Sequence, residues 1–468
     1  MTTSTKTQTW VLGLAATASF IVVLDLLVVS TALSTLQRDL AASVEQLEWT
    51  VNAYTLSFAV LLLTASALGD RFGRRRVFAA GLGLFGAASA ACALSPDAAT
   101  LIAARTVQGA GAATIMPLAL SVLNSAFPPE RRGWAMGIYG GVTGLAALLG
   151  PVLGGAITQG ISWQWIFWIN VPIAALAMPL VLARVPESFG PSTGLDFRGL
   201  ALGALAALGL VWGLVRGNAA GWGSAEVLVA LVGGAAFALG FVLAERRALS
   251  PMLPLRLFRS RAFSAGNATI FFLNASLTGG VFLTAQFLQV GLGQRPLAAG
   301  LELLPWGIAP FLVGPRAGAL VDRIGERPLI ACGLVLQTIG LAWISLIAGP
   351  DLAYLELVAP MTVAGIGFSM ALPAVTKAVV GGVAMQDIGK ASGAFSTMRQ
   401  LGGAFGVAIL VAVFSAAGSY GSAQAFSDGF GPAIAVAAGL AFAGAVAASL
   451  LPRGTRDREV APAAAASA

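Results

Sequence analysis

Asp25 has the clearest capacity for chemistry in this sequence, because it interrupts the apolar stretch 22–29 (VVLDLLVV). An ionised aspartate in lipid is costly, so we expect it to be protonated or to face a cavity. A nearby lipophilic cation would favour the ionised form, and protonation would expel that cation. One carboxylate could therefore couple proton movement to the movement of a substrate, with a purely structural ion pair as the alternative.

Arg105 is the expected partner of Asp25. It opens the segment 105–111 (RTVQGAG) inside another apolar stretch, and an arginine in a span costs about 2.5–3.5 kcal/mol unless it has a partner or a cavity. Asp25 lies about 8 residues, or ~12 Å, before the outer end of its predicted helix, and Arg105 lies about 6 Å from the same surface. The two depths predict a pair, and extension of Arg105 to the membrane surface is the alternative.

Other charges within predicted spans are weaker candidates. Glu302 is expected at the outer start of a helix, where the helix dipole favours a carboxylate, and is kept as a second group for attracting cations. Arg399 is predicted to lie deeper in its span, and both a functional and a structural role stay open. Arg316 and Lys377 lie near inner helix ends, where long side chains reach the interface.

Several function classes are excluded by the residues the chain lacks. It contains no histidine and no phosphate-binding GxxxxGK[ST] loop, which argues against a membrane enzyme and an ATP-driven pump. Its two cysteines, Cys92 and Cys332, lie in apolar runs and suggest buried hydrophobic side chains. We therefore predict no enzyme activity, no metal site and no cofactor, with H⁺ as the coupling ion.

The apolar composition predicts the elements that must position these charges. Of the 468 residues, 57% are hydrophobic and 10% are charged, whereas soluble proteins carry about 25% charged residues. Helices suit lipid because they satisfy backbone groups internally, and each span needs roughly 20 apolar residues. We expect an all-α integral membrane protein with fourteen transmembrane helices, at 10–33, 49–68, 77–95, 101–123, 133–156, 164–183, 199–216, 226–244, 263–290, 301–320, 328–348, 356–380, 394–416 and 431–451.

The basic residues predict the orientation. With both termini in the cytoplasm, 20 of the 27 Lys and Arg residues fall on cytoplasmic segments, three lie outside and four lie within spans. This bias follows the positive-inside rule, and the inverted topology would reverse it. The net charge of +7 and pI near 10.1 are thus explained by topology, and we expect membrane lipids, not nucleic acid, as partners.

An internal repeat predicts the domain organisation. The segment 67–74 (ALGDRFGR) recurs at 319–326 (ALVDRIGE), an offset of 252 residues. Six spans and their loops need roughly 200 residues, so the surplus predicts two extra helices between two halves. The expected parts are an N-terminal six-helix bundle (1–183), a cytoplasmic linker (184–198), two inserted helices (199–244), a C-terminal six-helix bundle (245–451) and a cytoplasmic tail (452–468).

With these motifs in order, the chain resembles the major facilitator superfamily, in particular its fourteen-helix drug:proton antiporter branch (EmrB/QacA type). The segment 68–76 (LGDRFGRRR) matches the superfamily's most widespread motif, although Ser66 replaces its usual first glycine. The resemblance implies that this loop fastens the two halves in the outward-open state. The residues carried over are Asp70, Arg71, Gly73 and Arg74, with Asp322, Arg323 and Gly325 in the second copy; setting orientation alone is the alternative.

A glycine-rich fifth helix carries the second part of the resemblance. Glycines spaced by four lie on one helix face and allow close helix packing, and Pro151 removes a backbone bond. In the family this is the antiporter motif, typical of exporters, and generic packing is the alternative. Its residues here are Gly141, Gly150, Pro151, Gly154 and Gly155; the segments 163–172 (WQWIFWINVP) and 399–403 (RQLGG) are also typical of this branch.

The resemblance implies proton-motive-force-driven efflux of lipophilic, often cationic, drugs from the bacterial cell across its inner membrane. Alternating access would move the small-molecule substrate. The alternative within this class is a dedicated exporter of one endogenous metabolite or antibiotic that protects its producer. Family members generally work as monomers, and some use accessory export proteins.

Overall fold

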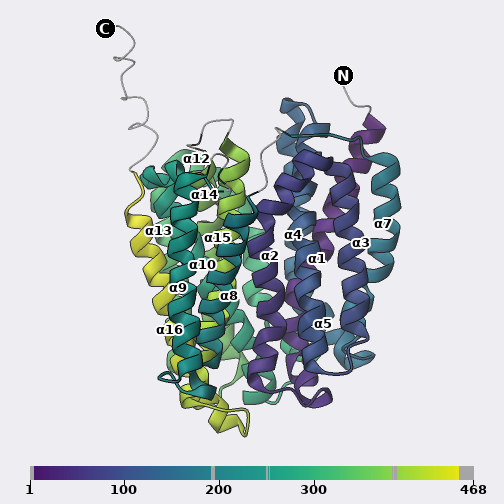
Figure 1. The fold of residues 1–468 in the computed structure, drawn as a ribbon. Coiled ribbons are helices and arrows are strands. Elements are labelled where there is room, and N and C mark those ends of the chain that lie inside the picture. The colour runs from purple at the N-terminus through teal and green to yellow at the C-terminus, as the bar shows by residue number, and fades with distance from the viewer. Residues whose placement is uncertain are drawn as a thin grey trace.

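The structure is a computed structural model that describes residues 5–190, 196–248, 251, 253–381, 383 and 387–452. In this part of the chain the secondary structure is helical, and the long helices run side by side as one bundle (Figure 1). The N-terminal half contains α1 (Thr5–Asp39), α2 (Val44–Phe72), α3 (Arg74–Ala93), α4 (Ala98–Ala126), α5 (Pro129–Gly160), α6 (Trp165–Trp168) and α7 (Asn170–Arg184).

The remaining helices form an inserted pair and a second half. The pair is α8 (Phe197–Ala220) and α9 (Ala225–Arg247). The C-terminal half contains η1 (Leu255–Arg259), α10 (Arg261–Gln286), η2 (Phe287–Gly291), α11 (Pro296–Glu302), α12 (Leu304–Ile324), α13 (Glu326–Ile347), α14 (Tyr354–Val380), α15 (Ile388–Ala417) and α16 (Ala423–Ser449).

The predicted number of spans is confirmed when one broken helix is counted as a single span. Thirteen helices in the described residues are long and apolar enough to cross a membrane, and α11 with the first part of α12 makes a fourteenth, bent by 42°. The bend lies at Leu303, next to Pro305 in the first turn of α12. Proline fits this position because it has no backbone N–H to donate.

This break corrects the predicted position of Glu302. The helix begins at Pro296, so Glu302 is the last residue of α11 and not part of a first turn. A helix C-terminus carries partial negative charge, which disfavours a carboxylate. The dipole argument for Glu302 is therefore wrong, because the apolar pattern did not reveal the helix that precedes it.

The two ends of the bundle differ in how the halves meet. We call the end that holds Thr5 and Ser449 the terminal face and the other end the distal face (Figure 1). Near the distal face one apolar core joins both halves, with Val29 and Trp163 from the first half and Phe287 and Phe414 from the second. Toward the terminal face each half has a separate core. The halves thus share a core distally and have separate cores toward the terminal face, where α15 still contacts α2: Thr397 donates to the carbonyl oxygen of Ala59 at 3.3 Å, and a Cβ on Gly393 would overlap Leu63.

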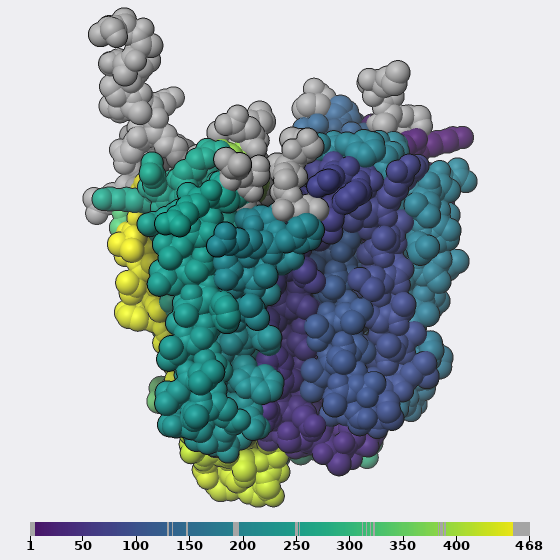
Figure 2. Space-filling view, in the orientation of Figure 1, coloured from purple at the N-terminus to yellow at the C-terminus, as the bar shows by residue number. Residues whose placement is uncertain are grey.

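The inserted pair covers the junction between the halves. Helix α8 packs on α9, on α2 of the first half and on α15 of the second. Val211 and Ala207 share an apolar cluster with Trp49 and Ala404. In Figure 2 the teal surface of α8 and α9 lies beside the purple surface of α2. The pair therefore shields one side of the junction from lipid.

Candidate functional site

Asp25 lies at the centre of a buried polar cluster in the first half. Its side chain is 0% exposed and forms an ion pair with Nη1 of Arg105. Nε2 of Gln108 donates to Oδ1 of Asp25 at 2.8 Å, and Nδ2 of Asn170 donates to the same oxygen at 2.9 Å. Both carboxylate oxygens are therefore occupied, which allows a charge to persist away from water.

Arg105 is held by several groups, although its enclosed Nη2 has no hydrogen-bond partner among the described residues. Its Nε donates to the carbonyl oxygen of Thr50 at 3.1 Å, and its Nη1 donates to Oε1 of Gln108 at 2.7 Å. The guanidinium carbon lies 4.1 Å from the centroid of the Tyr54 ring and 5.7 Å from that of Phe167. Aromatic faces attract a cation, so this pocket stabilises the guanidinium as well as the pair.

Two glycines of the motif 105–111 bring α4 close enough to place Arg105. A Cβ on Gly109 would overlap the carbonyl oxygen of Tyr54 in α2, and a Cβ on Gly111 would lie 2.8 Å from the backbone nitrogen of Phe85 in α3. Small residues let helix backbones approach closely in a membrane. Any larger residue at these positions would push α4 away from α2 and α3 and increase the distance between the side chains of Arg105 and Asp25.

Ser89 and Cys92 extend the cluster into α3. Nε2 of Gln108 donates to Oγ of Ser89 at 2.8 Å, and Sγ of Cys92 lies 3.5 Å from Oε1 of Gln108. The cluster thus joins α1, α2, α3, α4 and α7. Neutralising Asp25 would alter hydrogen bonds on several helices at once, which is the property that a conformational switch requires.

The structure brings the predicted pair together but changes the chemistry expected of it. Asp25 is completely enclosed, and Arg105, Gln108 and Asn170 stand between it and any other group. Direct competition between a cation and a proton at this carboxylate does not fit this geometry. Proton movement at Asp25 would instead act through Arg105 on the packing of α4.

Arg399 lies in α15 and faces the other half of the protein. It is half-buried, and its enclosed Nε has no hydrogen-bond partner. The ionisable group near it is the phenol of Tyr139 in α5, whose hydroxyl donates to Oγ of Ser19 at 2.7 Å. Of the two open interpretations, this position favours a functional one.

Glu302 lies near the distal face, apart from the Asp25 cluster. It is half-buried, its Oε2 is enclosed without a hydrogen-bond partner, and Tyr354 is its ionisable neighbour. An acceptor of this kind is costly to keep away from water. The structure therefore leaves Glu302 as a separate carboxylate and does not join it to Asp25.

The loop between α2 and α3 is held by the segment that follows α7. Gly73 has φ +103°, a conformation that glycine adopts without strain. Asp70 accepts from Nε of Arg74 at 2.8 Å, and its carbonyl oxygen accepts from Gly190 at 3.2 Å. Oε1 of Glu187 accepts from the backbone nitrogen of Arg75 at 2.9 Å. Asp70 therefore pairs with Arg74, and these contacts lie within the first half and its linker.

The second copy of this loop repeats the backbone turn. Gly325 has φ +85° and follows directly after α12, as Gly73 follows α2. Arg323 is exposed, and the side chain of Asp322 lies outside the described part of the chain. Glu326 lies 3.8 Å from Nζ of Lys377. The shared turn supports the predicted repeat.

The glycine stripe of α5 is packed in its distal part and open near the terminal face. A Cβ on Gly154 would overlap the carbonyl oxygen of Val28, and one on Gly155 would overlap that of Pro296. A Cβ on Gly150 would lie 2.8 Å from Cβ of Leu27. Gly141, by contrast, has no atom within 4 Å of such a Cβ. Gly150 and Gly154 therefore hold α5 against α1 of its own half, Gly155 holds it against α11 of the other half, and Gly141 faces open space.

Helices α11 and α12 of the second half are likewise packed distally and open toward the terminal face. A Cβ on Gly300 would overlap the carbonyl oxygen of Pro151, and one on Gly307 would lie 3.3 Å from Leu148. Gly314 and Gly318 lie on the same face as Gly307 by helical geometry, and neither has an atom within 4 Å. Helices α5 and α12 thus leave the contact at the same level.

Glu48 was missed by the sequence analysis, because the apolar pattern placed it just before the second span. It lies inside α2, is 1% exposed, and its Oε1 has no hydrogen-bond partner. Tyr420, whose hydroxyl donates to Oε1 of Gln286, is close enough for Glu48 to act on it. Burial and the Glu48 charge raise the pKa of the Tyr420 phenol. The capping box of Ser43 and Gln46 signalled that this helix begins before Glu48.

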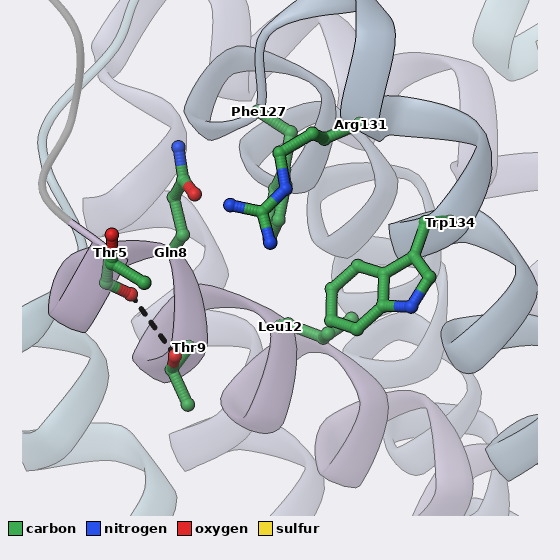
Figure 3. A pocket seen from close by; sticks show the side chains of 7 residues that line it. All are labelled: Thr5, Gln8, Thr9, Leu12, Phe127, Arg131 and Trp134. Atoms are coloured by element: carbon green, nitrogen blue, oxygen red, sulfur yellow. Dashed lines mark hydrogen bonds between the residues drawn. The ribbon is translucent and has the colours of Figure 1, made fainter.

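A small pocket lies at the terminal face, between α1 and the α4–α5 connection. Figure 3 shows Arg131 between Gln8 of α1 and Trp134, with Leu12 of α1 below them. The guanidinium carbon of Arg131 lies 5.7 Å from the Trp134 ring centroid. The lining also includes Thr5, Thr9 and Phe127. None of the predicted site residues lines this pocket, so it is separate from the Asp25 cluster.

These features define a class: a multi-pass inner-membrane transporter with two helical halves around a junction that opens at one end. A profile of the Major Facilitator Superfamily matches residues 15–407. The chain belongs to the Major Facilitator Superfamily, as its motifs predicted. A solved structure of a POT family transporter shares this fold with a TM-score of 0.70 at 15% identity, over 92% of this chain and 94% of that one.

Relatives of similar length include export and resistance proteins. The cephamycin export protein CmcT of Amycolatopsis lactamdurans is 37% identical over 92% of this chain and 90% of that protein. The multidrug resistance protein Stp of Mycobacterium tuberculosis is 34% identical over 88% of this chain and 76% of that protein. The methylenomycin A resistance protein of Bacillus subtilis is 36% identical over 82% of this chain and 83% of that protein.

Proposed function

We propose that this protein exports lipophilic small molecules, drugs or antibiotics, from the bacterial cell by proton antiport with alternating access. The single observation that carries the proposal is the enclosed Asp25–Arg105 pair, which links five helices of one half. The names of the relatives, which are export and resistance proteins, support the export direction.

In this mechanism, proton binding at Asp25 changes the balance between two arrangements. When Asp25 is ionised, it pairs with Arg105 and accepts from Gln108 and Asn170. A proton on Asp25 leaves the Arg105 charge without its counter-ion, which costs several kcal/mol in a dry site. An arrangement in which α4 moves and Arg105 meets water or another acceptor then becomes favourable. For antiport, Asp25 takes up its proton from outside after the substrate has left. The protonated protein then returns to the inward-open arrangement, where loss of the proton to the cytoplasm restores the pair with Arg105.

In the proposed orientation the terminal face lies on the cytoplasmic side of the membrane. The positive-inside bias of the loops supports this orientation. In the present arrangement the junction is open toward that face on its α5–α12 side, so a substrate would enter there from the cytoplasm or the inner leaflet. Ser34 of α1, which donates to Gln289 of η2, and the contact of Gly155 with Pro296 would close the path outward. We take the monomer as the transport unit; an accessory export protein is compatible with it.

The test is transport of lipophilic dyes into energised everted membrane vesicles. We expect wild-type transport to stop when an uncoupler collapses the proton gradient, and Asp25→Asn to lose it with normal insertion. Asp428→Asn is the matched control, because Asp428 is an exposed aspartate of α16. Full transport by Asp25→Asn would remove this residue from the coupling step and direct attention to Glu302 or Glu48.

A second candidate is a dedicated exporter of one antibiotic. It is favoured by relatives named for single compounds, cephamycin and methylenomycin A. A susceptibility panel in a strain that lacks its own efflux pumps separates the two. Protection against one chemical family supports the dedicated exporter, and protection against several unrelated families supports the multidrug exporter.

A further inference from the structure

Arg399 is a cation without a counter-ion in the interior of the membrane bundle. It lies about 12 residues into the 30-residue helix α15, at mid-depth of the span. Among the described residues it forms no ion pair, and its enclosed Nε has no acceptor. The other deeply placed arginine, Arg105, is paired with Asp25. An unpaired guanidinium at this depth is costly, and such groups in membrane proteins face cavities and bind substrates or ions.

The backbone around Arg399 is fixed, so its direction is a property of the fold. Nδ2 of Asn274 in α10 donates to the carbonyl oxygen of Arg399 at 2.8 Å. A Cβ on Gly402 would overlap the carbonyl oxygen of Phe271, and one on Gly403 would lie 3.0 Å from Nδ2 of Asn274. The close approach of α10 and α15 therefore holds this turn, while the guanidinium extends toward the first half.

The group that Arg399 approaches is Tyr139 of α5, a buried residue of the first half. On the opposite face of α5, Gly137 and Gly141 have no atom within 4 Å of a Cβ position, and Gly314 of α12 is open in the same way. Tyr139 donates to Ser19 and so leaves its own oxygen lone pairs as neutral acceptors for Arg399. Arg399 thus lies between the two halves with part of its side chain exposed, and Thr397, two residues nearer the terminal face, still donates to the carbonyl oxygen of Ala59 in α2 at 3.3 Å.

The carboxylates deep in the bundle are not available to a substrate here. Asp25 is 0% exposed and Glu48 is 1% exposed. A lipophilic cation entering the junction would meet the positive charge of Arg399 without a free carboxylate at its level. A carboxylate-bearing molecule would supply the missing counter-ion through charge-assisted hydrogen bonds, which arginine forms in a bidentate geometry.

We propose that Arg399 binds the acidic group of the substrate, and that this transporter carries amphipathic organic anions, apolar molecules with a carboxylate or an equivalent acidic group. The inference rests on the proposed export function and narrows it from lipophilic compounds in general. The guanidinium and the carboxylate neutralise each other, so the complex presents little net charge as the halves rearrange.

The test uses three probes on one apolar scaffold: 1-pyrenebutyrate, its methyl ester, and the corresponding pyrenylbutyl-trimethylammonium. Binding to the purified protein is measured by pyrene fluorescence, and transport is measured in everted vesicles. The variants are Arg399→Gln, Arg399→Lys and the control Arg316→Gln. Arg316 is an exposed arginine of α12 that donates to the carbonyl oxygen of Leu312 and lies on the side of the helix opposite Gly314.

We expect wild type to prefer the carboxylate, and Arg399→Gln to weaken its binding by about 10- to 100-fold, the range for one charge-assisted bond. Arg399→Lys should restore part of the affinity, and the ester should bind all variants equally. Arg316→Gln should behave as wild type. Unfolding of each variant in detergent is followed in parallel, and the ester serves as the internal check that the site has formed.

Three results would overturn the inference. They are preference of wild type for the cation, an equal loss of all three probes in Arg399→Gln, and binding of none of them by wild type. Uncoupler-sensitive transport of the ester or cation without dependence on Arg399 would leave the export function standing and refute the anion site. Carboxylate-selective binding that depends on Arg399, without proton-driven transport, would support the anion site and refute the proposed coupling.

Discussion

The strongest prediction concerns the energy of the Asp25–Arg105 pair. Asp25→Asn preserves the shape of the side chain and removes its charge, so the enclosed Arg105 loses its counter-ion. Both side chains are 0% exposed, so water cannot compensate. Removing one partner of a buried pair costs about 3–5 kcal/mol. The hydrogen bond from Arg105 to Thr50 and the Tyr54 ring remain, so we expect a loss near the lower end of that range.

The double variant Asp25→Asn/Arg105→Gln should recover part of this loss, because no uncompensated charge then remains in the site. The assay is reversible unfolding by SDS in mixed micelles, which gives the free energy of unfolding for wild type, both single variants and the double variant. We expect a coupling energy of about 2 kcal/mol or more, above the 0.3–0.5 kcal/mol seen for independent sites. Additive effects would show that the pair does not share one energetic unit and would refute the mechanism built on it.

Three further predictions test the gates and the missed carboxylate. Gly155→Val should block closure of the distal face, because its side chain would overlap Pro296, whereas Gly141→Val should be tolerated in the present arrangement. Thiol labelling of cysteines placed at each face reports which face is open. Identical labelling of the two variants would contradict the prediction. Glu187→Gln should raise thiol labelling of the α2–α3 loop less than about fivefold, because a half-exposed ion pair contributes under ~1 kcal/mol; a larger rise would mean a stronger lock. Glu48→Leu should raise the free energy of unfolding by about 1–3 kcal/mol, since an enclosed oxygen without a partner is removed, and a loss of stability would reveal a partner.

Depth in the membrane was determined by the sequence. Each helical residue advances about 1.5 Å along the axis, so the number of residues from a helix end gives the level of a side chain. This placed Asp25 and Arg105 at similar depths and predicted their pairing, which the structure confirms. The span count and the turn at Gly73 also followed from local properties, apolar length and backbone freedom.

The direction in which each side chain points around its helix axis was decided only by the tertiary structure. Gln108 and Asn170 were visible as parts of motifs, but their convergence on Asp25 depends on how α4 and α7 rotate against α1. The same holds for Arg399, whose Nε has no partner among the described residues and which α15 turns toward Tyr139 of the other half. In a membrane, an apolar helix can turn almost any side toward lipid or toward its neighbours at a similar free energy. The composition of the helix therefore does not set its rotation about its own axis. Close glycine contacts and the few buried polar groups set it, and these depend on neighbouring helices far away in the sequence.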